Sequence, residues 1–123
     1  MKFERVIIIR DKTRLEQLIE RFNSKAQAKF YIESSGGDFE FFELEHDKFY
    51  ESLSKIKEII TGSFKYKVIN RSFLPTYIFT ENDLVLVIGQ DGLVANTAKY
   101  VSGLPIIGIN PDSERYDGVL LKH

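Results

Sequence analysis

The sequence predicts an α/β domain built on a three-layer, mostly parallel sheet, with an extended helical segment between the first two strands. Two observations carry this prediction. Nearly continuous runs of β-branched residues and leucine occur at residues 6–9, 84–88 and 105–109, and such runs are typical of parallel strands covered on both faces. Between the first run and a further apolar run at 66–69, apolar residues recur at helical spacing.

The helical segment has recognisable start and stop signals. Residues 13–16 form a capping box, in which a threonine hydroxyl and a glutamate carboxylate satisfy backbone donors at a helix start. A second, weaker box at residues 24–27 predicts another helix, which the glycine pair at 36–37 ends. A third helix is expected to begin near Asp38 and to end at Gly62.

Aromatic residues are concentrated in this segment. Phe39, Phe41 and Phe42, with Tyr50 close by, provide more aromatic surface than one buried helical stripe requires. One interpretation is extra core that covers the sheet. The other is a helical arm that makes a homodimer, because exposed aromatic patches tend to mark interfaces.

The second half of the chain reads as a βαβ unit, which is expected to be right-handed. The strand at 84–88 leads into the tight turn 89–92, a helix follows, and the strand at 105–109 returns. The strand at 66–69 alternates with lysines, which predicts one wetter face and a place at the edge of the sheet. Residues 119–121 are expected to form a further strand.

Composition excludes several classes of function. Seventeen basic and eighteen acidic residues give a net charge of -1, which argues against nucleic acid as a partner. Cysteine is absent, so the chain has no disulfide framework, thiolate metal site or cysteine nucleophile. The first apolar run has only four residues, too short for a signal sequence or a membrane span. We expect a cytoplasmic protein that makes no contact with a membrane.

The candidate ligand site follows from topology. Open α/β sheets bind ligands outside the carboxyl ends of the strands, where the strand order reverses. With the first strand between the second and the third, that point lies between residues 10–12 and the turn 89–92. Arg10 and Lys12 are expected to neutralise phosphate charge. Arg71, after the second strand, contacts phosphate or is an ordinary surface arginine.

The turn itself has chemistry suited to a phosphate-bearing ligand. Gly89 and Gly92 are expected to allow close approach of the backbone and to take positive φ, and the following helix presents N–H groups and the positive end of its dipole. Asp91 is suited to accept a proton from a hydroxyl or to hold Mg²⁺ through water. The alternative is that Asp91 is simply the N-cap of the helix.

Three other polar residues are candidates for the site. Asn96 and Thr97, early in the helix after the turn, either face a ligand or close the first turn locally. His46 lies in a charged stretch, which favours a solvated helix face over a metal site.

Residues 83–110 resemble the N-terminal domain of ATP-dependent NAD kinases, in a superfamily that also includes diacylglycerol kinases. That family carries a strand ending in Gly-Gly-Asp-Gly-Thr, a helix, and a strand ending in Gly-Val/Ile-Asn. Here the corresponding segments are Gly89-Gln90-Asp91-Gly92 and Gly108-Ile109-Asn110. The resemblance implies a Rossmann-like fold, ATP with Mg²⁺ as phosphate donor, and NAD as a possible substrate.

The resemblance also assigns roles. Asp91 matches the aspartate that activates the ribose 2′-hydroxyl of NAD, Gly89 and Gly92 match the phosphate-binding glycines, and Asn110 matches the asparagine after the following strand. Gln90 replaces the second glycine and places a side chain where the backbone would approach phosphate. Leu93 replaces the usual threonine or serine.

These observations predict one nucleotide-binding domain over residues 1–123, as the N-terminal part of a longer two-domain protein. The expected activity is an NAD-kinase-like phosphotransferase that binds a small-molecule nucleotide. The alternative, from a different class, is a non-catalytic nucleotide-binding or oligomerisation module with a degenerate kinase site. In either case we expect a homodimer or a higher oligomer.

Overall fold

The computed structural model describes residues 3–111 and the backbone of residues 119–122. Its residues form two compact units, a sheet unit (Met1–Asp11 with Ser52–His123) and a helical unit (Lys12–Glu51). The strands are β1 (Arg5–Arg10), β2 (Lys65–Asn70), β3 (Asp83–Ile88), β4 (Ile106–Ile109) and β5 (Val119–Lys122). The helices are α1 (Arg14–Phe22), α2 (Lys25–Ser34), α3 (Phe39–Ile60), the 3₁₀ turn η1 (Arg71–Phe73) and α4 (Asp91–Ala98).

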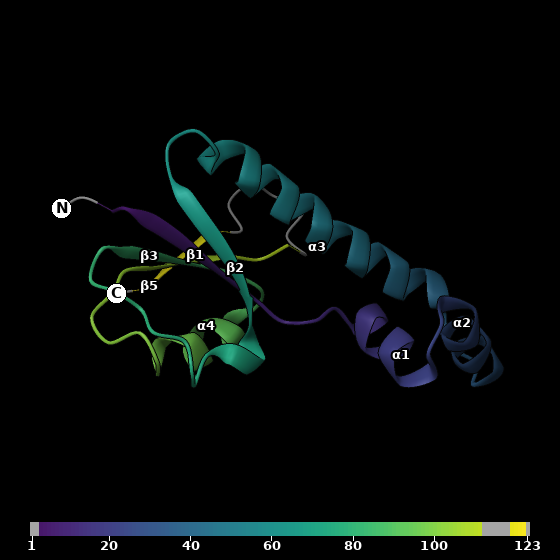
Figure 1. Cartoon of the computed structure of the whole chain (residues 1–123). Coiled ribbons are helices and arrows are strands. Elements are labelled where there is room, and N and C mark those ends of the chain that lie inside the picture. The colour runs from purple at the N-terminus through teal and green to yellow at the C-terminus, as the bar shows by residue number, and fades with distance from the viewer. Residues whose placement is uncertain (1–2, 112–118, 123) are drawn as a thin grey trace. The chain divides into compact units, whose positions relative to one another are not determined.

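The sheet unit contains one five-stranded sheet in the order β2-β1-β3-β4-β5 (Figure 1). The first four strands are parallel to their neighbours, whereas β5 is antiparallel to β4. The prediction of a mostly parallel α/β sheet is therefore confirmed. So are the central position of β1 between β2 and β3 and the edge position of β2.

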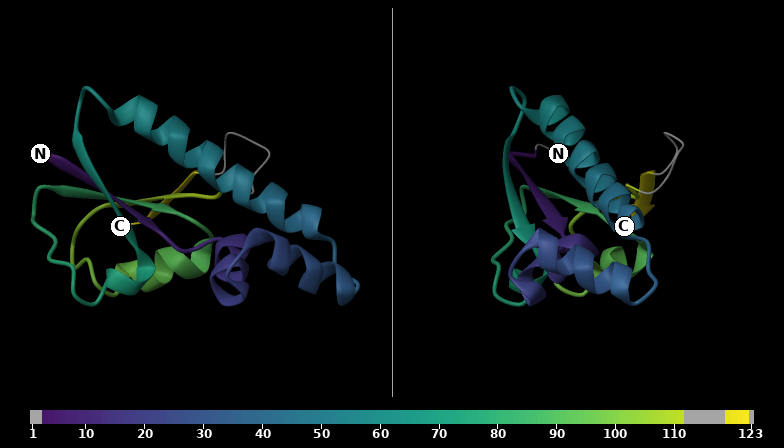
Figure 2. Two further views of the ribbon diagram at one scale, coloured as in Figure 1. Left: turned by 45° about the vertical axis from the view of Figure 1, so that its right-hand side comes forward. Right: turned by 90° about the vertical axis from the view of Figure 1, so that its right-hand side faces the viewer.

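Both faces of the sheet are covered within this unit. Alternate strand residues make one buried face, because successive side chains of a strand point to opposite sides. This core cluster consists of Ile7, Ile9, Ile69, Leu74, Val85, Val87, Leu93, Val94, Val101 and Ile106. Val6, Ile8 and Leu86 are buried on the opposite face, on the side where residues 52–60 of α3 lie (Figures 1 and 2). The unit therefore has three layers.

The connection from β2 to β3 was not predicted in detail. It contains only η1 and an irregular segment from Leu74 to Asn82. Leu74 is buried, and Tyr77 and Phe79 pack against the same core cluster as α4. This segment therefore covers part of the sheet where a second helix would otherwise be needed.

A salt bridge ties the first residues of two central strands together. Arg5 of β1 lies opposite Asp83 of β3, and its Nε and Nη2 atoms each donate to a carboxylate oxygen at 2.9 Å. The Thr80 N–H donates to the same carboxylate at 2.8 Å. Burial opposes the charge on Asp83, which is 1% exposed, yet these hydrogen bonds outweigh burial and hold its pKa below the ordinary value.

The helices of the helical unit begin where the sequence predicted. Thr13 forms the complete capping box with Glu16 at the start of α1, and the Ser24 hydroxyl accepts from the Gln27 N–H at the start of α2. After α2, Gly36 takes positive φ.

The aromatic residues of α3 belong mainly to a second core. Phe39 is buried with Leu15, Ala28 and Ile32 of the helical unit, and Phe42 packs against this cluster. The expectation that these residues add core over the sheet is therefore wrong for Phe39 and Phe42. The cluster accounts for Phe39 and Phe42, because the helices of this unit need a core of their own, whereas Phe41 and Tyr50 are exposed.

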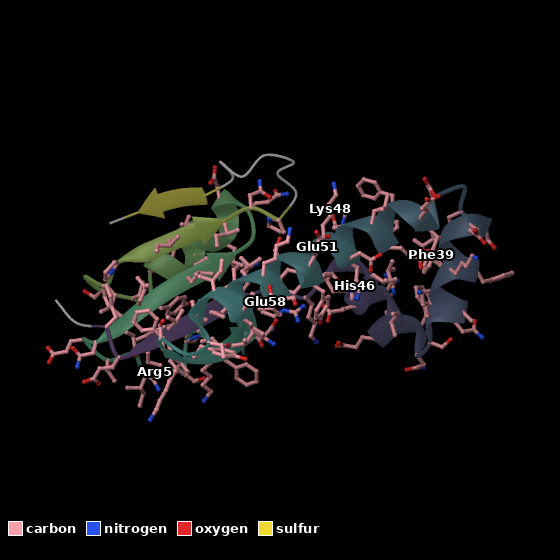
Figure 3. The ribbon with its side chains drawn as sticks, turned by 90° about the horizontal axis from the view of Figure 1, so that it is seen from above. Arg5, Phe39, His46, Lys48, Glu51 and Glu58 are labelled. Carbon is pink, nitrogen blue, oxygen red and sulfur yellow. The ribbon has the colours of Figure 1, made fainter. Side chains whose placement is uncertain are left out.

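His46 was expected on a solvated helix face, and this expectation is wrong. Its side chain is partly buried in the helical unit, on the same helix as Phe39 (Figure 3). Its Nδ1 lies 2.8 Å from the Thr13 hydroxyl, and its ring centroid lies 4.8 Å from that of Tyr50. His46 thus connects α3 to the cap of α1.

Removing the carboxylate of Asp83 is expected to destabilise the protein. Asp83→Asn should lower the free energy of unfolding at neutral pH by roughly 2–3 kcal/mol, because it leaves Arg5 without its charged partner in a largely buried pair. Arg5 is 34% exposed, so solvent screening keeps the loss below that of a fully buried pair. Urea denaturation measures the change, with Glu81→Gln at an exposed position as the matched control.

The loss should also depend on pH. A carboxyl group with a lowered pKa in the folded state stabilises the fold above its unfolded pKa, about 3.9, and this contribution disappears as pH falls through the folded pKa. The difference in the free energy of unfolding between the parent and Asp83→Asn should therefore be largest at neutral pH and become smaller in acid. An undiminished difference at about pH 2.5 would contradict this account.

Candidate functional site at the carboxyl edge of the sheet

The strand register brings the predicted site segments to one edge of the sheet. Arg10, the last residue of β1, lies opposite Asn70 at the end of β2 and opposite Ile88 at the end of β3. Ile88 in turn lies opposite Ile109 at the end of β4. The residues that follow these strands therefore emerge side by side at the edge where α/β sheets bind ligands.

The turn after β3 leads directly into α4. Gln90 is the N-cap residue, with extended backbone and no side-chain capping bond, and Asp91 is the first helical residue. The interpretation of Asp91 as the N-cap is therefore wrong. The Leu93 N–H donates to the Gln90 carbonyl at 3.0 Å, whereas the N–H groups of Asp91 and Gly92 have no acceptor within the helix.

The two glycines of the turn have different surroundings. Neither Gly89 nor Gly92 takes the positive φ that was expected. In the described part of the chain, the glycines with positive φ are residues 36, 62 and 103. A Cβ atom on Gly89 would lie 2.9 Å from Cδ2 of the buried Leu93. A Cβ atom on Gly92 would meet nothing within 4 Å. Gly89 is therefore closely packed against Leu93, and the surface above Gly92 is open.

Arg10 and Asn110 flank this turn. The Arg10 Nε donates to the Asp11 carbonyl at 3.2 Å. The Gly89 N–H donates to the carbonyl of Ile109 at 2.9 Å, which places the following Asn110 next to the turn. Both side chains are partly exposed, so the edge carries a cation and an amide on either side of the turn.

Lys12 follows Asp11 directly in the chain. It is the first residue of the helical unit. Its ammonium lies 2.6 Å from a carboxylate oxygen of Glu20 on α1.

Arg71 does reach the edge, in a pocket of about 430 Å³ beside α4. Its Nη1 lies 3.3 Å from Oδ2 of Asp11. The pocket is lined mostly by polar side chains from the ends of β1 and β2 and from α4 and its C-terminal end. They are Asp11, Asn70, Arg71, Ser72, Asn96 and Tyr100, with Pro75.

Asn96 and Thr97, the two candidate residues in α4, differ in whether they line the pocket. Asn96 lines the pocket, whereas Thr97 is fully buried and its hydroxyl donates to the Leu93 carbonyl at 2.8 Å. Tyr100 was missed as a lining residue, because nothing in its sequence neighbourhood distinguishes it from a surface tyrosine. The positions of Asp11 and Asn70 in the sequence do indicate a place at this edge, since Asp11 directly follows β1 and Asn70 ends β2.

Over the residues that the structure describes, no three His, Cys, Asp or Glu side chains come together as a metal site would require. In the same residues, no helix has the length and apolar character to cross a membrane. Comparison of the chain with protein-family models, with curated proteins and with solved structures gave no match.

Alanine substitution should separate the two glycines. Gly89→Ala is expected to lower the free energy of unfolding by roughly 1–2 kcal/mol, because the new methyl group displaces a buried leucine. Gly92→Ala should raise it by about 0.5 kcal/mol, because alanine is the better helix former and has open space. Chemical denaturation of both variants tests this difference, and equal effects would contradict it.

Proposed function

We propose that the sheet unit binds a nucleotide at this edge and acts as an NAD-kinase-like phosphotransferase domain. The observation that carries the proposal is the strand order β2-β1-β3. It makes the turn Gly89–Gly92 and the end of β1 the two sides of the point where the strand order reverses, which is the usual ligand position in open α/β sheets.

The turn fits the phosphate groups of such a ligand. The N–H groups of Asp91 and Gly92 open the helix without intrahelical acceptors, and oxyanions bind well at such positions. The open space above Gly92 permits close approach to the backbone. Arg10, at the end of the neighbouring strand, supplies a positive charge.

Asp91 is the residue that we propose as the proton acceptor. Its carboxylate is exposed in the first turn of α4, where the carboxylate can reach a bound hydroxyl group. Mg²⁺ bound with ATP would stabilise charge on the transferred phosphoryl group. One carboxylate suits Mg²⁺ that is held mainly by substrate phosphates. The chain's own contribution is then positioning of the donor and acceptor.

The two departures from the family motif affect this site differently. Leu93 is buried in the core cluster and packs against Gly89, so it replaces a hydroxyl group with core packing. Gln90 is exposed at the N-cap, so its amide lies at the surface of the turn and is placed to contact a bound phosphate.

Calorimetry with ATP–Mg²⁺, NAD and NADP is the direct test. We expect binding of at least one ligand to the parent chain and its loss in Gly92→Val, because the new side chain fills the space that the phosphate needs. Ala95→Val, which places the same side chain at an exposed position one turn later in α4, is the control and should bind normally. Asp91→Asn should retain binding and abolish formation of NADP from NAD and ATP.

Two results would contradict the proposal. Normal binding to Gly92→Val would move the phosphate site away from the turn. Undiminished NADP formation by Asp91→Asn would remove Asp91 as the base.

A second candidate function is self-association through the helical unit, for which the exposed apolar residues provide the support. Phe30 is 70%, Phe41 53% and Leu44 54% exposed. Such side chains tend to mark interfaces when they gather on one surface. We propose a second copy of the chain as the partner, in keeping with a homodimer or a higher oligomer.

Sedimentation velocity tests this candidate. The parent is expected to sediment as a dimer or larger, and the double substitution Phe30→Asp with Leu44→Asp should give a monomer. Ile59→Asp, at a 76% exposed position of the sheet unit, should leave the association unchanged. A monomeric parent at micromolar concentration would contradict the candidate.

A further inference from the structure

We propose that the pocket beside α4 is a separate binding site for a sugar phosphate, in which Arg71 binds the phosphate and Asp11 occupies the phosphate position in the free protein. The proposal goes beyond the assignment of the glycine turn. It depends on a different set of residues, all within the sheet unit.

The Arg71–Asp11 pair has the properties of a displaceable contact. Its atoms lie 3.3 Å apart, and the two side chains are 51% and 43% exposed. An exposed pair of this kind contributes little to stability. A phosphate carries more negative charge than a carboxylate and accepts two parallel hydrogen bonds from a guanidinium group. A ligand phosphate can therefore replace Asp11 at Arg71 at small cost.

The neighbouring side chains suit the hydroxyl groups of a sugar. The Asn70 Nδ2 donates to the Ser72 hydroxyl oxygen at 2.9 Å. A serine hydroxyl that accepts this bond keeps its own proton to donate, and the Asn70 amide oxygen remains an acceptor. Asn96 adds another amide from α4. The wall is thus a mixture of donors and acceptors next to one cation, which matches a phosphorylated sugar better than an apolar ligand.

The two members of the pair should respond in opposite directions. Arg71→Gln removes the cation and should weaken binding about tenfold or more, since hydrogen bonds to charged groups are the stronger ones. Asp11→Asn removes the competitor and should tighten binding roughly three- to tenfold. A residue that merely supports the pocket would weaken binding whenever it is changed, so the reversal of sign is the distinguishing result.

The experiment titrates the whole chain with AMP, ribose 5-phosphate, inorganic phosphate and adenosine, followed by calorimetry and by amide chemical shifts. AMP and ribose 5-phosphate are expected to bind, with the largest shifts at Asn70, Arg71 and Asn96. Adenosine and inorganic phosphate should bind at least tenfold more weakly, because each lacks half of the recognised group. Tighter binding of AMP than of ribose 5-phosphate would identify a nucleotide as the source. Equal binding would identify the free sugar phosphate.

Lys29→Gln, an exposed charge change in the helical unit, is the matched control and should leave binding unchanged. The proposal is overturned if no phosphorylated ligand binds the parent, if adenosine binds as well as AMP, or if Asp11→Asn weakens binding as Arg71→Gln does. AMP binding that is lost in Gly92→Val but retained in Arg71→Gln would overturn this proposal alone. The reverse pattern would support this site while removing the glycine turn.

Discussion

The position of the candidate site depends on an ion pair at the opposite end of the sheet. Arg5 and Asp83 fix the starts of β1 and β3 against each other, and because parallel strands stay in register, they also fix Arg10 against Ile88. A shift of one residue would turn every buried side chain of one strand to the other face. It would also move the glycine turn away from the end of β1. The pair therefore determines which residues meet at the ligand edge.

Burying a charged pair between two strands costs desolvation free energy, and the geometry of this pair explains how the cost is offset. A buried carboxylate is unstable unless its oxygens are hydrogen-bonded. Asp83 receives bonds from both Arg5 nitrogens and from the Thr80 N–H. Apolar residues at these two positions would bury area equally well in either register, whereas this set of bonds forms in one register only. The ion pair thus contributes specificity of register as well as stability.

The sequence was sufficient for features that depend on neighbouring residues or on general topology. The apolar runs predicted β1 to β4, the caps at Thr13 and Ser24 predicted two helix starts, and the assumed central position of β1 agrees with the observed strand order. Features set by contacts between distant residues were not predictable. Arg71 contacts Asp11, which lies 60 positions away in the sequence. Phe39 packs into the core of the helical unit and not against the sheet. The close packing of Gly89 against Leu93 was likewise not predictable.

The contrast between the two glycines bears directly on the nucleotide proposal. Glycine inside a helix costs about 0.5–1 kcal/mol relative to alanine. At Gly89 close packing favours it, because a Cβ atom would lie 2.9 Å from Cδ2 of Leu93. At Gly92 neither φ nor packing requires it, since its φ is not positive and its surroundings are open. A residue that costs stability without a structural reason, in the first turn of a helix beside Arg10, is what close approach of a phosphate to the backbone would require. The fold thus accounts for Gly89, and the proposed ligand accounts for Gly92.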